Sequence, residues 1–212
     1  MLTAPLPLPQ TPPLRPRERE ILAAIRPVLA AKGFDGASMQ DLARAAGMSV
    51  GNFYRYFPSR AAIVEAIIQT DLEEVEQKFA LLLAAPDPLP VLRAALHARV
   101  HDELCACDDA TLWAEITAAA LRKPEIGVVV NRMEGEIVSW LTRGFALAAG
   151  LSAEQAQTRF TAHARLIVAL VKASAMHGRL PPDDGAALTA LIQRQIDGLL
   201  DDIAAARPED AS

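Results

Sequence analysis

The amino-acid sequence predicts an all-α fold of about nine helices, in which a small helix-turn-helix unit precedes a larger helical domain. Three observations support this prediction. Apolar residues recur at helical spacing through most of the chain, and no stretch alternates as a half-buried strand does. Capping patterns recur, in which a serine is followed three residues later by Asp or Gln. Glycine and proline stand between the periodic segments, where helices end or begin.

The chain begins with a proline-rich stretch at residues 1–16, which we expect to be an extended or disordered tail. A first helix is expected at residues 17–32, with Gly33 as its stop. Its buried stripe is predicted to be Ile21, Leu22, Ile25, Val28 and Leu29. Pro27 lies inside this helix, where it removes one backbone hydrogen bond and crowds the preceding turn, so we expect a kink there.

Residues 38–60 carry the clearest local signals and predict a helix-turn-helix. Ser38 and Asp41 form a capping box that begins one short helix. Gly47 ends that helix, because a residue without a Cβ adopts the left-handed backbone at little cost. Ser49 then caps a second short helix through its side-chain oxygen.

The second short helix is predicted to present one face to DNA. Phe53 and Phe57 lie one turn apart and are expected to face the core, so the opposite face turns to solvent. On that face Gly51 permits close approach of a ligand, and Arg55 supplies a planar guanidinium for a phosphate or a guanine edge. Arg60, at the amino terminus of the next helix, is expected to bind a second phosphate. The candidate DNA-binding residues are Ser38, Ser49, Val50, Gly51, Asn52, Tyr54, Arg55, Tyr56 and Arg60.

The charge of the chain is unevenly spread. Residues 15–60 hold eight Lys or Arg and four acids, a balance of +4, which leaves −9 for the rest of a chain whose net charge is −5. The basic end is therefore expected to be the end that meets DNA. No apolar run reaches the roughly 20 residues that a membrane span needs, so we expect no membrane association and a cytoplasmic protein. The two cysteines, Cys105 and Cys107, fit a reducing compartment.

The remaining helices are expected at residues 60–83, 89–105, 110–121, 124–149, 153–177 and 184–206. The segment APDPLP at residues 85–90 interrupts the pattern and predicts a domain boundary. Gly150 follows a helix end, and Ser152 with Gln155 forms a second capping box. We therefore predict a DNA-binding domain at residues 17–84, an effector-binding and dimerisation domain at residues 85–206, and a tail at residues 207–212.

The last two predicted helices carry more apolar surface than one buried face requires. This surplus favours a homodimer joined through a four-helix bundle, although the same helices can also close a monomeric core. The candidate dimerisation residues are Leu166, Leu170, Leu191, Ile192, Leu199 and Ile203.

The stretch GFDGASMQDLARAAGMSVGNFYRYFPSRAAIVEAI resembles the amino-terminal domain of the tetracycline-repressor (TetR) family of transcriptional regulators. The resemblance covers roughly residues 17–71 and rests on a Gly-x-Ser-x-Gly turn, a Tyr-x-Tyr-Phe run and a following basic residue. It implies an all-helical homodimeric repressor that binds double-stranded operator DNA and is released by a small effector. Two residues depart from the family pattern: Arg60 stands where Lys is usual, and Val50 removes one polar contact to bases.

The predicted helices at residues 89–177 are expected to enclose the effector. Their aromatic, Met and His side chains favour an apolar or amphipathic ligand, although each aromatic can equally be core. The candidate ligand-binding residues are His97, His101, Trp113, Met133, Trp140, Phe160 and His163. The segment TLWAEITAAALRKPEIGVVV is similar to family members related to the repressors of choline and betaine metabolism. That similarity implies a cationic ligand held by Trp113 and Glu115.

The sequence suggests three alternative functions. His97, His101 and Cys105 recur every four residues, with Cys107 just beyond, a stripe that suits a metal sensor; core or surface residues are the simpler interpretation. A helical interaction protein without DNA binding is the second alternative. An enzyme is the third and is not expected, because no phosphate-binding loop, nucleophile elbow or zinc-protease motif occurs. No cofactor is expected.

Overall fold

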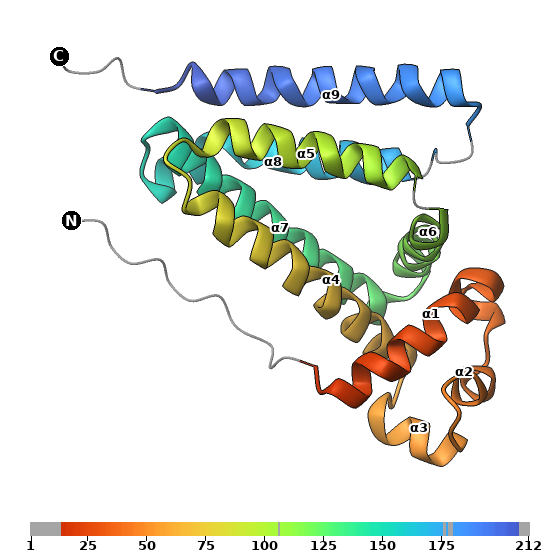
Figure 1. Ribbon diagram of the computed structural model, residues 1–212. Coiled ribbons are helices and arrows are strands. Elements are labelled where there is room, and N and C mark those ends of the chain that lie inside the picture. The colour runs from red at the N-terminus through yellow and green to blue at the C-terminus, as the bar shows by residue number, and fades with distance from the viewer. Residues whose placement is uncertain (1–13, 106, 176, 178–179, 208–212) are drawn as a thin grey trace.

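The computed structural model describes residues 14–105, 107–175, 177 and 180–207 (Figure 1). Of the tails predicted at residues 1–16 and 207–212, residues 1–13 and 208–212 lie outside the described part of the chain. Within the described part the chain folds into helices only, which confirms the predicted class. The helices are α1 (Pro16–Gly36), α2 (Met39–Ala45), α3 (Val50–Tyr56), α4 (Arg60–Leu83), α5 (Pro88–Cys105), α6 (Cys107–Arg122), α7 (Pro124–Ala149), α8 (Ala153–Ala175) and α9 (Pro182–Ala204).

The helix-turn-helix follows its predicted local signals. The Ser38 hydroxyl accepts a hydrogen bond from the Asp41 amide at 3.1 Å, and the Asp41 carboxylate accepts one from the Ser38 amide at 3.0 Å. Gly47 has the left-handed φ of 66° that ends α2. The Ser49 hydroxyl then accepts the Asn52 amide at 3.3 Å and begins α3. Each short helix therefore starts at a side-chain cap.

The first helix differs from its prediction in one respect. The residue that leaves helical geometry is Gly33, with φ 72° and ψ 166°, whereas Pro27 lies inside the helix. The predicted stop at Gly33 is therefore a break, after which one further turn leads to Gly36. The predicted stripe is buried at Ile21, Leu22, Ile25 and Leu29, while Val28 is only partly buried.

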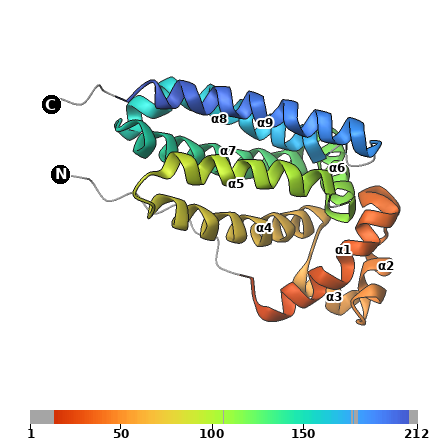
Figure 2. The same cartoon turned by 45° about the horizontal axis from the view of Figure 1, so that its top comes forward.

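The helices form two parts: a smaller one, which we call the foot (α1–α3), and a larger one, which we call the body (α4–α9). Figures 1 and 2 show α1, α2 and α3 at one end of the molecule, with α4 and α7 running side by side toward the other end. Helices α5, α8 and α9 pack together in the body, and α6 lies against α1. Among the described helices, none has both the length and the apolar character that crossing a membrane requires.

Two clusters of buried side chains form the core. The first cluster joins α1–α4 to α6 and the start of α7; it includes Ile21, Leu22, Ile25, Leu29, Phe34, Leu42, Phe53, Phe57, Ile63, Ile67, Leu112, Ile116, Ile126, Val130 and Met133. The second cluster lies in the body; it includes Leu82, Leu92, Val100, Val138, Leu141, Phe145, Phe160, Ile167, Ile192, Ile196, Leu200 and Ile203. Because the first cluster crosses the boundary predicted after residue 84, α6 and α7 form part of the support for the foot.

The structure corrects the predicted dimerisation set at two positions. Ile192 is 5% exposed and Ile203 is fully buried, because one face of α9 packs on α5 and α8 of the same chain. These two side chains are therefore core and are closed to a partner. The opposite face differs, since Leu166 and Leu191 are 48% and 46% exposed. Leu170 and Leu199 are half-buried at the edge of the second cluster.

Candidate nucleic-acid interface

The outward face of α3 is exposed as the sequence predicts. Phe53 and Phe57 are buried in the first cluster with ring centroids 5.6 Å apart, and they anchor one side of the helix. Gly51, Asn52, Tyr54 and Arg55 are exposed on the other side. A Cβ added at Gly51 would meet no other atom within 4 Å, so packing within the chain does not require glycine there. The missing side chain leaves room for a molecule outside the protein.

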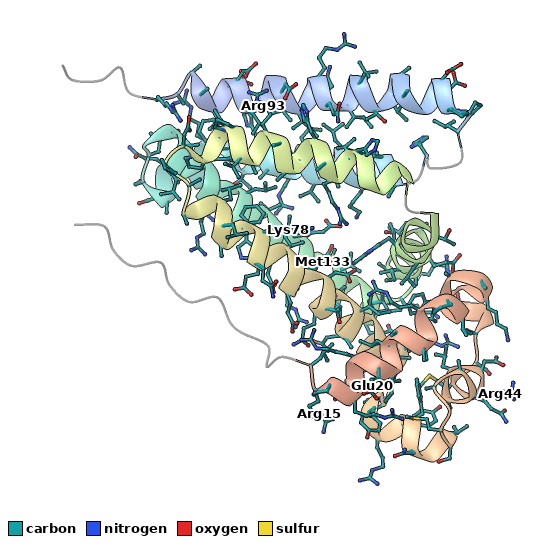
Figure 3. All side chains as sticks on the ribbon, in the orientation of Figure 1. Arg15, Glu20, Arg44, Lys78, Arg93 and Met133 are labelled. Carbon is teal, nitrogen blue, oxygen red and sulfur yellow. The ribbon has the colours of Figure 1, made fainter. Side chains whose placement is uncertain are left out.

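Two further residues of α3 are less exposed. Val50 is half-buried against the first cluster, and Tyr56 is half-buried on the same cluster. The Arg15 guanidinium lies over the Tyr56 ring, 5.7 Å from its centroid. This contact joins the start of α1 to the recognition helix, and the spacing of 41 residues gives no local signal for it. Figure 3 shows Arg15 at the end of the molecule that holds α1–α3.

The acidic side chains of this unit are paired with cations other than Arg55. Glu18 pairs with Arg15 at 2.5 Å, Glu20 with Arg17 at 2.6 Å, and Asp41 with Lys32 at 3.2 Å and Arg44 at 3.4 Å. Arg55 takes part in none of these pairs and is exposed. Its charge is thus available to a polyanion, whereas the charges of α1 are largely balanced within the protein.

The predicted caps Ser38 and Ser49 are exposed, but both hydroxyls already accept a backbone hydrogen bond. In the first cap, hydrogen bonds from Ser38 and Lys32 lower the pKa of Asp41 to about 2. The carboxylate is therefore charged at neutral pH and holds the amino terminus of α2. Any DNA contact by either serine must share a hydroxyl that caps a helix.

Arg60 lies at the start of α4 as predicted, but it has partners within the chain. Its half-buried guanidinium donates to the carbonyl oxygens of Phe34, in the last turn of α1, and of Ala37, the residue that follows α1. These carbonyls follow the break at Gly33, where a helix end needs donors from elsewhere. The structure thus gives Arg60 an intramolecular partner that its predicted role did not include. The contact spans 26 residues and could not be read from local spacing.

The predicted ligand-binding aromatics are distributed over the core. Met133 belongs to the first cluster and Trp113 packs against it. Phe160 belongs to the second cluster, where its ring meets Phe145 edge-on at 6.3 Å, and Trp140 packs on a ring of α4. The structure thus distributes these residues over two clusters, and their role in binding an effector stays a prediction. Large apolar side chains fill the spaces between helices, and the sequence does not separate that use from a pocket.

The predicted ligand-binding histidines are also apart. The His97 Nε2 lies 2.8 Å from an Asp197 oxygen on α9, and His101 is exposed one turn further along α5. His163 on α8 lies 3.5 Å from Asp202, with its ring edge-on to Phe160. His97 also lines a surface groove of about 420 Å³ together with Asp87, Leu89, Pro90, Arg93 and Ala94. Figure 3 shows Arg93 on the side of α5 that faces α9.

The metal alternative falls partly outside the described side chains, since those of Cys105 and Cys107 are not among them. Among the described side chains, no group of three or more His, Cys, Asp or Glu is placed to hold a metal ion.

Sequence comparisons connect the foot of the molecule with known proteins. Residues 21–67 match the family described as bacterial regulatory proteins, tetR family. The HTH-type transcriptional regulator UidR of Escherichia coli (strain K12) is 24% identical over 129 residues, 61% of this chain and 64% of that relative. The chain therefore spans less than two thirds of that relative's length. EthR of Mycolicibacterium smegmatis is 38% identical over 63 residues, 30% of this chain and 29% of that protein.

Solved structures share the fold over most of the chain. GusR from Salmonella enterica superposes with a TM-score of 0.67 and 27% identity, over 90% of this chain and 98% of that chain. AibR, solved in complex with isovaleryl coenzyme A and operator DNA, has a TM-score of 0.55 and 19% identity, over 87% and 96%. The second likeness concerns the fold alone.

Proposed function

Because this chain belongs to the tetR family of bacterial regulatory proteins, we propose that it is a transcriptional regulator that binds operator DNA as a homodimer and responds to a small effector. Repression released by that effector is the mode that the family resemblance favours. One observation carries the proposal. The exposed face of α3 carries both Gly51 and Arg55. Packing within the chain does not require a glycine at Gly51, and Arg55 takes part in none of the ion pairs described above.

The proposed dimer uses the outer faces of α8 and α9. Leu166 and Leu191 are each almost half exposed on these neighbouring helices, although leucines are mostly buried in soluble proteins. A two-fold axis through this face gives two copies of α3 for a near-palindromic site. The half-sites would then lie about one helical turn, roughly 34 to 36 Å, apart.

The proposed effector acts by changing the separation of the two recognition helices. A ligand that favours the mismatched spacing by about 3 kcal/mol would weaken DNA binding more than a hundredfold. AibR, a protein of similar fold, was solved in complex with isovaleryl coenzyme A and operator DNA, so a protein of this fold can bind both a small molecule and DNA. The effector of the present protein is to be sought by thermal-shift screening, because the predicted aromatic residues do not define one cavity.

The test is a binding titration on DNA from the flanks of the protein's own gene, with scrambled DNA beside it and a series of salt concentrations. Arg55→Ala should cost about 1 to 3 kcal/mol on the operator, relax preference at one base position in each half-site, and affect scrambled DNA less. Tyr54→Phe should weaken both DNAs, because a phenol has no second donor for bidentate reading of a base.

Lys78→Ala is the matched control, since it removes an exposed positive charge from the distant part of α4 (Figure 3). It should leave operator affinity unchanged. Equal losses on both DNAs with a flatter salt slope would make Arg55 a phosphate contact. Wild-type protein that binds none of the flanking DNA would instead favour the helical interaction protein.

A further inference from the structure

The last turn of α1, which follows the break at Gly33, is held from two sides. The Phe34 amide donates to a Glu115 carboxylate oxygen of α6 at 3.2 Å, and the Phe34 carbonyl accepts from Arg60 of α4. The next residue, Asp35, pairs with Arg122 at 2.9 Å and with Lys123 at the junction of α6 and α7. A stretch of two residues thus contacts α4, α6 and the start of α7.

Gly33 adds an independent observation about the same contact. A Cβ placed on Gly33 would lie 2.6 Å from the Glu115 oxygen and 3.0 Å from its carboxyl carbon. The carboxylate therefore occupies the space in which any other residue would carry its side chain. Gly33 also has a φ of +72°, which L residues with side chains rarely adopt. Gly33 therefore has two roles: it adopts the positive φ of this turn, and its missing side chain leaves the space that the Glu115 carboxylate occupies.

The contact of Glu115 with Gly33 and Phe34 lies close in the chain to α2 and α3, the two helices of the helix-turn-helix. Only residues 37 and 38 separate α1 from α2, and α2 leads through the Gly47 turn to α3. The path of the chain after Gly33 therefore sets the direction in which α2 and α3 leave α1. Phe34, whose amide Glu115 holds, is itself buried in the first cluster.

We propose that Glu115 is a positioning residue for DNA recognition: its carboxylate, which lies against Gly33 and accepts from the Phe34 amide, fixes the last turn of α1 and with it the path into α2 and the orientation of α3. This inference rests on the proposed function. It also assigns Glu115 a role different from the binding of a cationic ligand, which the sequence similarity implied. The role needs an accepting oxygen at this point and does not need the negative charge, since the partner is a neutral backbone amide.

The experiment compares Glu115→Ala and Glu115→Gln with the wild-type protein. Amide hydrogen exchange at Phe34 and DNA titrations are measured for each. In Glu115→Ala the Phe34 amide should exchange about tenfold faster, as expected for one lost hydrogen bond. The ratio of operator to scrambled-DNA affinity should fall about threefold to tenfold, with an unchanged salt slope because no phosphate contact is lost. Glu115→Gln should restore both values, because an amide oxygen still accepts.

The matched control is Glu125→Ala, which removes an exposed carboxylate from the start of α7. Gly33→Ala gives a second route, because its Cβ displaces the carboxylate. Its effect on affinity should be smaller in the Glu115→Ala background, since the collision is then gone. If Glu115→Ala matches Glu125→Ala in exchange and in DNA discrimination, the inference is wrong. If the wild type binds no DNA, the proposed function fails, while unchanged exchange at Phe34 would still refute the contact.

Discussion

The short helices α2 and α3 and the long helices of the body stabilise their polar groups in different ways. In the foot, α2 and α3 have seven residues each and begin at serine caps three residues from the amides that they bind. In the body the helices are longer, and charged side chains join them across about a hundred residues of sequence. Arg93 of α5 pairs with Asp197 and Asp201 of α9 at 2.5 and 2.6 Å.

This difference explains where a binding surface is left open. Local caps satisfy the ends of the short helices without covering their sides, so the outer face of α3 remains exposed. In the body, the contacts between helices use the polar faces as well as the apolar ones. His97 and Lys172, for example, are already paired with acids of neighbouring helices. The surface that we propose for DNA is thus formed by α3, a short helix that begins at a local cap.

The largest expected effect tests whether the first and the second cluster of buried side chains unfold independently. Phe53→Ala in the first cluster and Phe160→Ala in the second each remove a buried ring, at a cost of about 3 to 5 kcal/mol in the free energy of unfolding. We expect Phe53→Ala to expose the amides of α1–α3 first and to abolish DNA binding. Phe160→Ala should leave those amides protected. Hydrogen exchange and chemical denaturation measure both.

This prediction depends on how strongly the packing of α1 on α6 couples the unfolding of the two clusters. If both variants raise exchange equally in foot and body, the two clusters unfold as one unit and the comparison between them fails.

The second prediction concerns the outer face of the body. Replacing Leu166 and Leu191 together by Asp should monomerise the protein, because each exposed leucine would become a charge inside the proposed interface. A cost of about 3 kcal/mol would already raise the dimer dissociation constant more than a hundredfold. Sedimentation measures the change. Leu81→Asp, at a leucine of α4 that is 75% exposed, is the control. An unchanged dimer in the double variant would place the interface elsewhere.

The third prediction concerns Arg60, which the sequence predicts to contact a phosphate and which the structure pairs with two backbone carbonyls. Arg60→Ala should lower the free energy of unfolding by about 1 to 3 kcal/mol, because two carbonyls lose their charged donor. The slope of log affinity against log salt should not change. A phosphate contact would instead flatten that slope by about 0.9. Arg60→Lys keeps the charge and loses the fork, so it should recover only part of the stability.

A flatter slope at unchanged stability in Arg60→Ala would restore the predicted phosphate contact. In that case the guanidinium leaves the carbonyls of Phe34 and Ala37 when DNA binds.

These cases show which features the sequence could predict. The caps at Ser38 and Ser49, the turn at Gly47 and the buried pair Phe53 and Phe57 depend on neighbours within four residues. Their physical causes are therefore visible in the sequence itself. The sequence predicts that the inner surface of α9 is apolar, but it assigns part of that surface to a dimer partner. An apolar stripe does not show whether the residues that cover it belong to the same chain or to a second one.

The candidate site follows the same division. The exposure of Gly51 and Arg55 follows from helix periodicity, and the structure agrees with it. The partners of Arg60 and Glu115 lie 26 and 81 residues away in the sequence, and only the fold brings them together. Trp140 and Phe160 were candidates for a pocket for a similar reason: an aromatic residue in a helix has the same pattern in a core as in a ligand site.

The smallest expected effect compares the two capping boxes, one in the foot and one in the body. Ser38→Ala and Ser152→Ala each remove a hydroxyl that accepts a backbone amide, at about 1 kcal/mol. Only the first box contains an acid. Because the folded pKa of Asp41, about 2, lies below its usual 3.8, the charged carboxylate stabilises the folded state above pH 3.8. That contribution is lost as the pH falls toward 2.

The two variants should therefore differ in acid although they cost about the same at neutral pH. Ser38→Ala removes the strongest cause of the lowered pKa of Asp41, so stability should fall less steeply than in the wild type between pH 4 and pH 2. In Ser152→Ala the partner is the uncharged Gln155, and the loss should stay constant over that range. Chemical denaturation at pH 7, 4, 3 and 2 measures both. Parallel curves for the two variants would mean that the charge of Asp41 adds nothing to the cap, and that foot and body cap their helices by the hydroxyl alone.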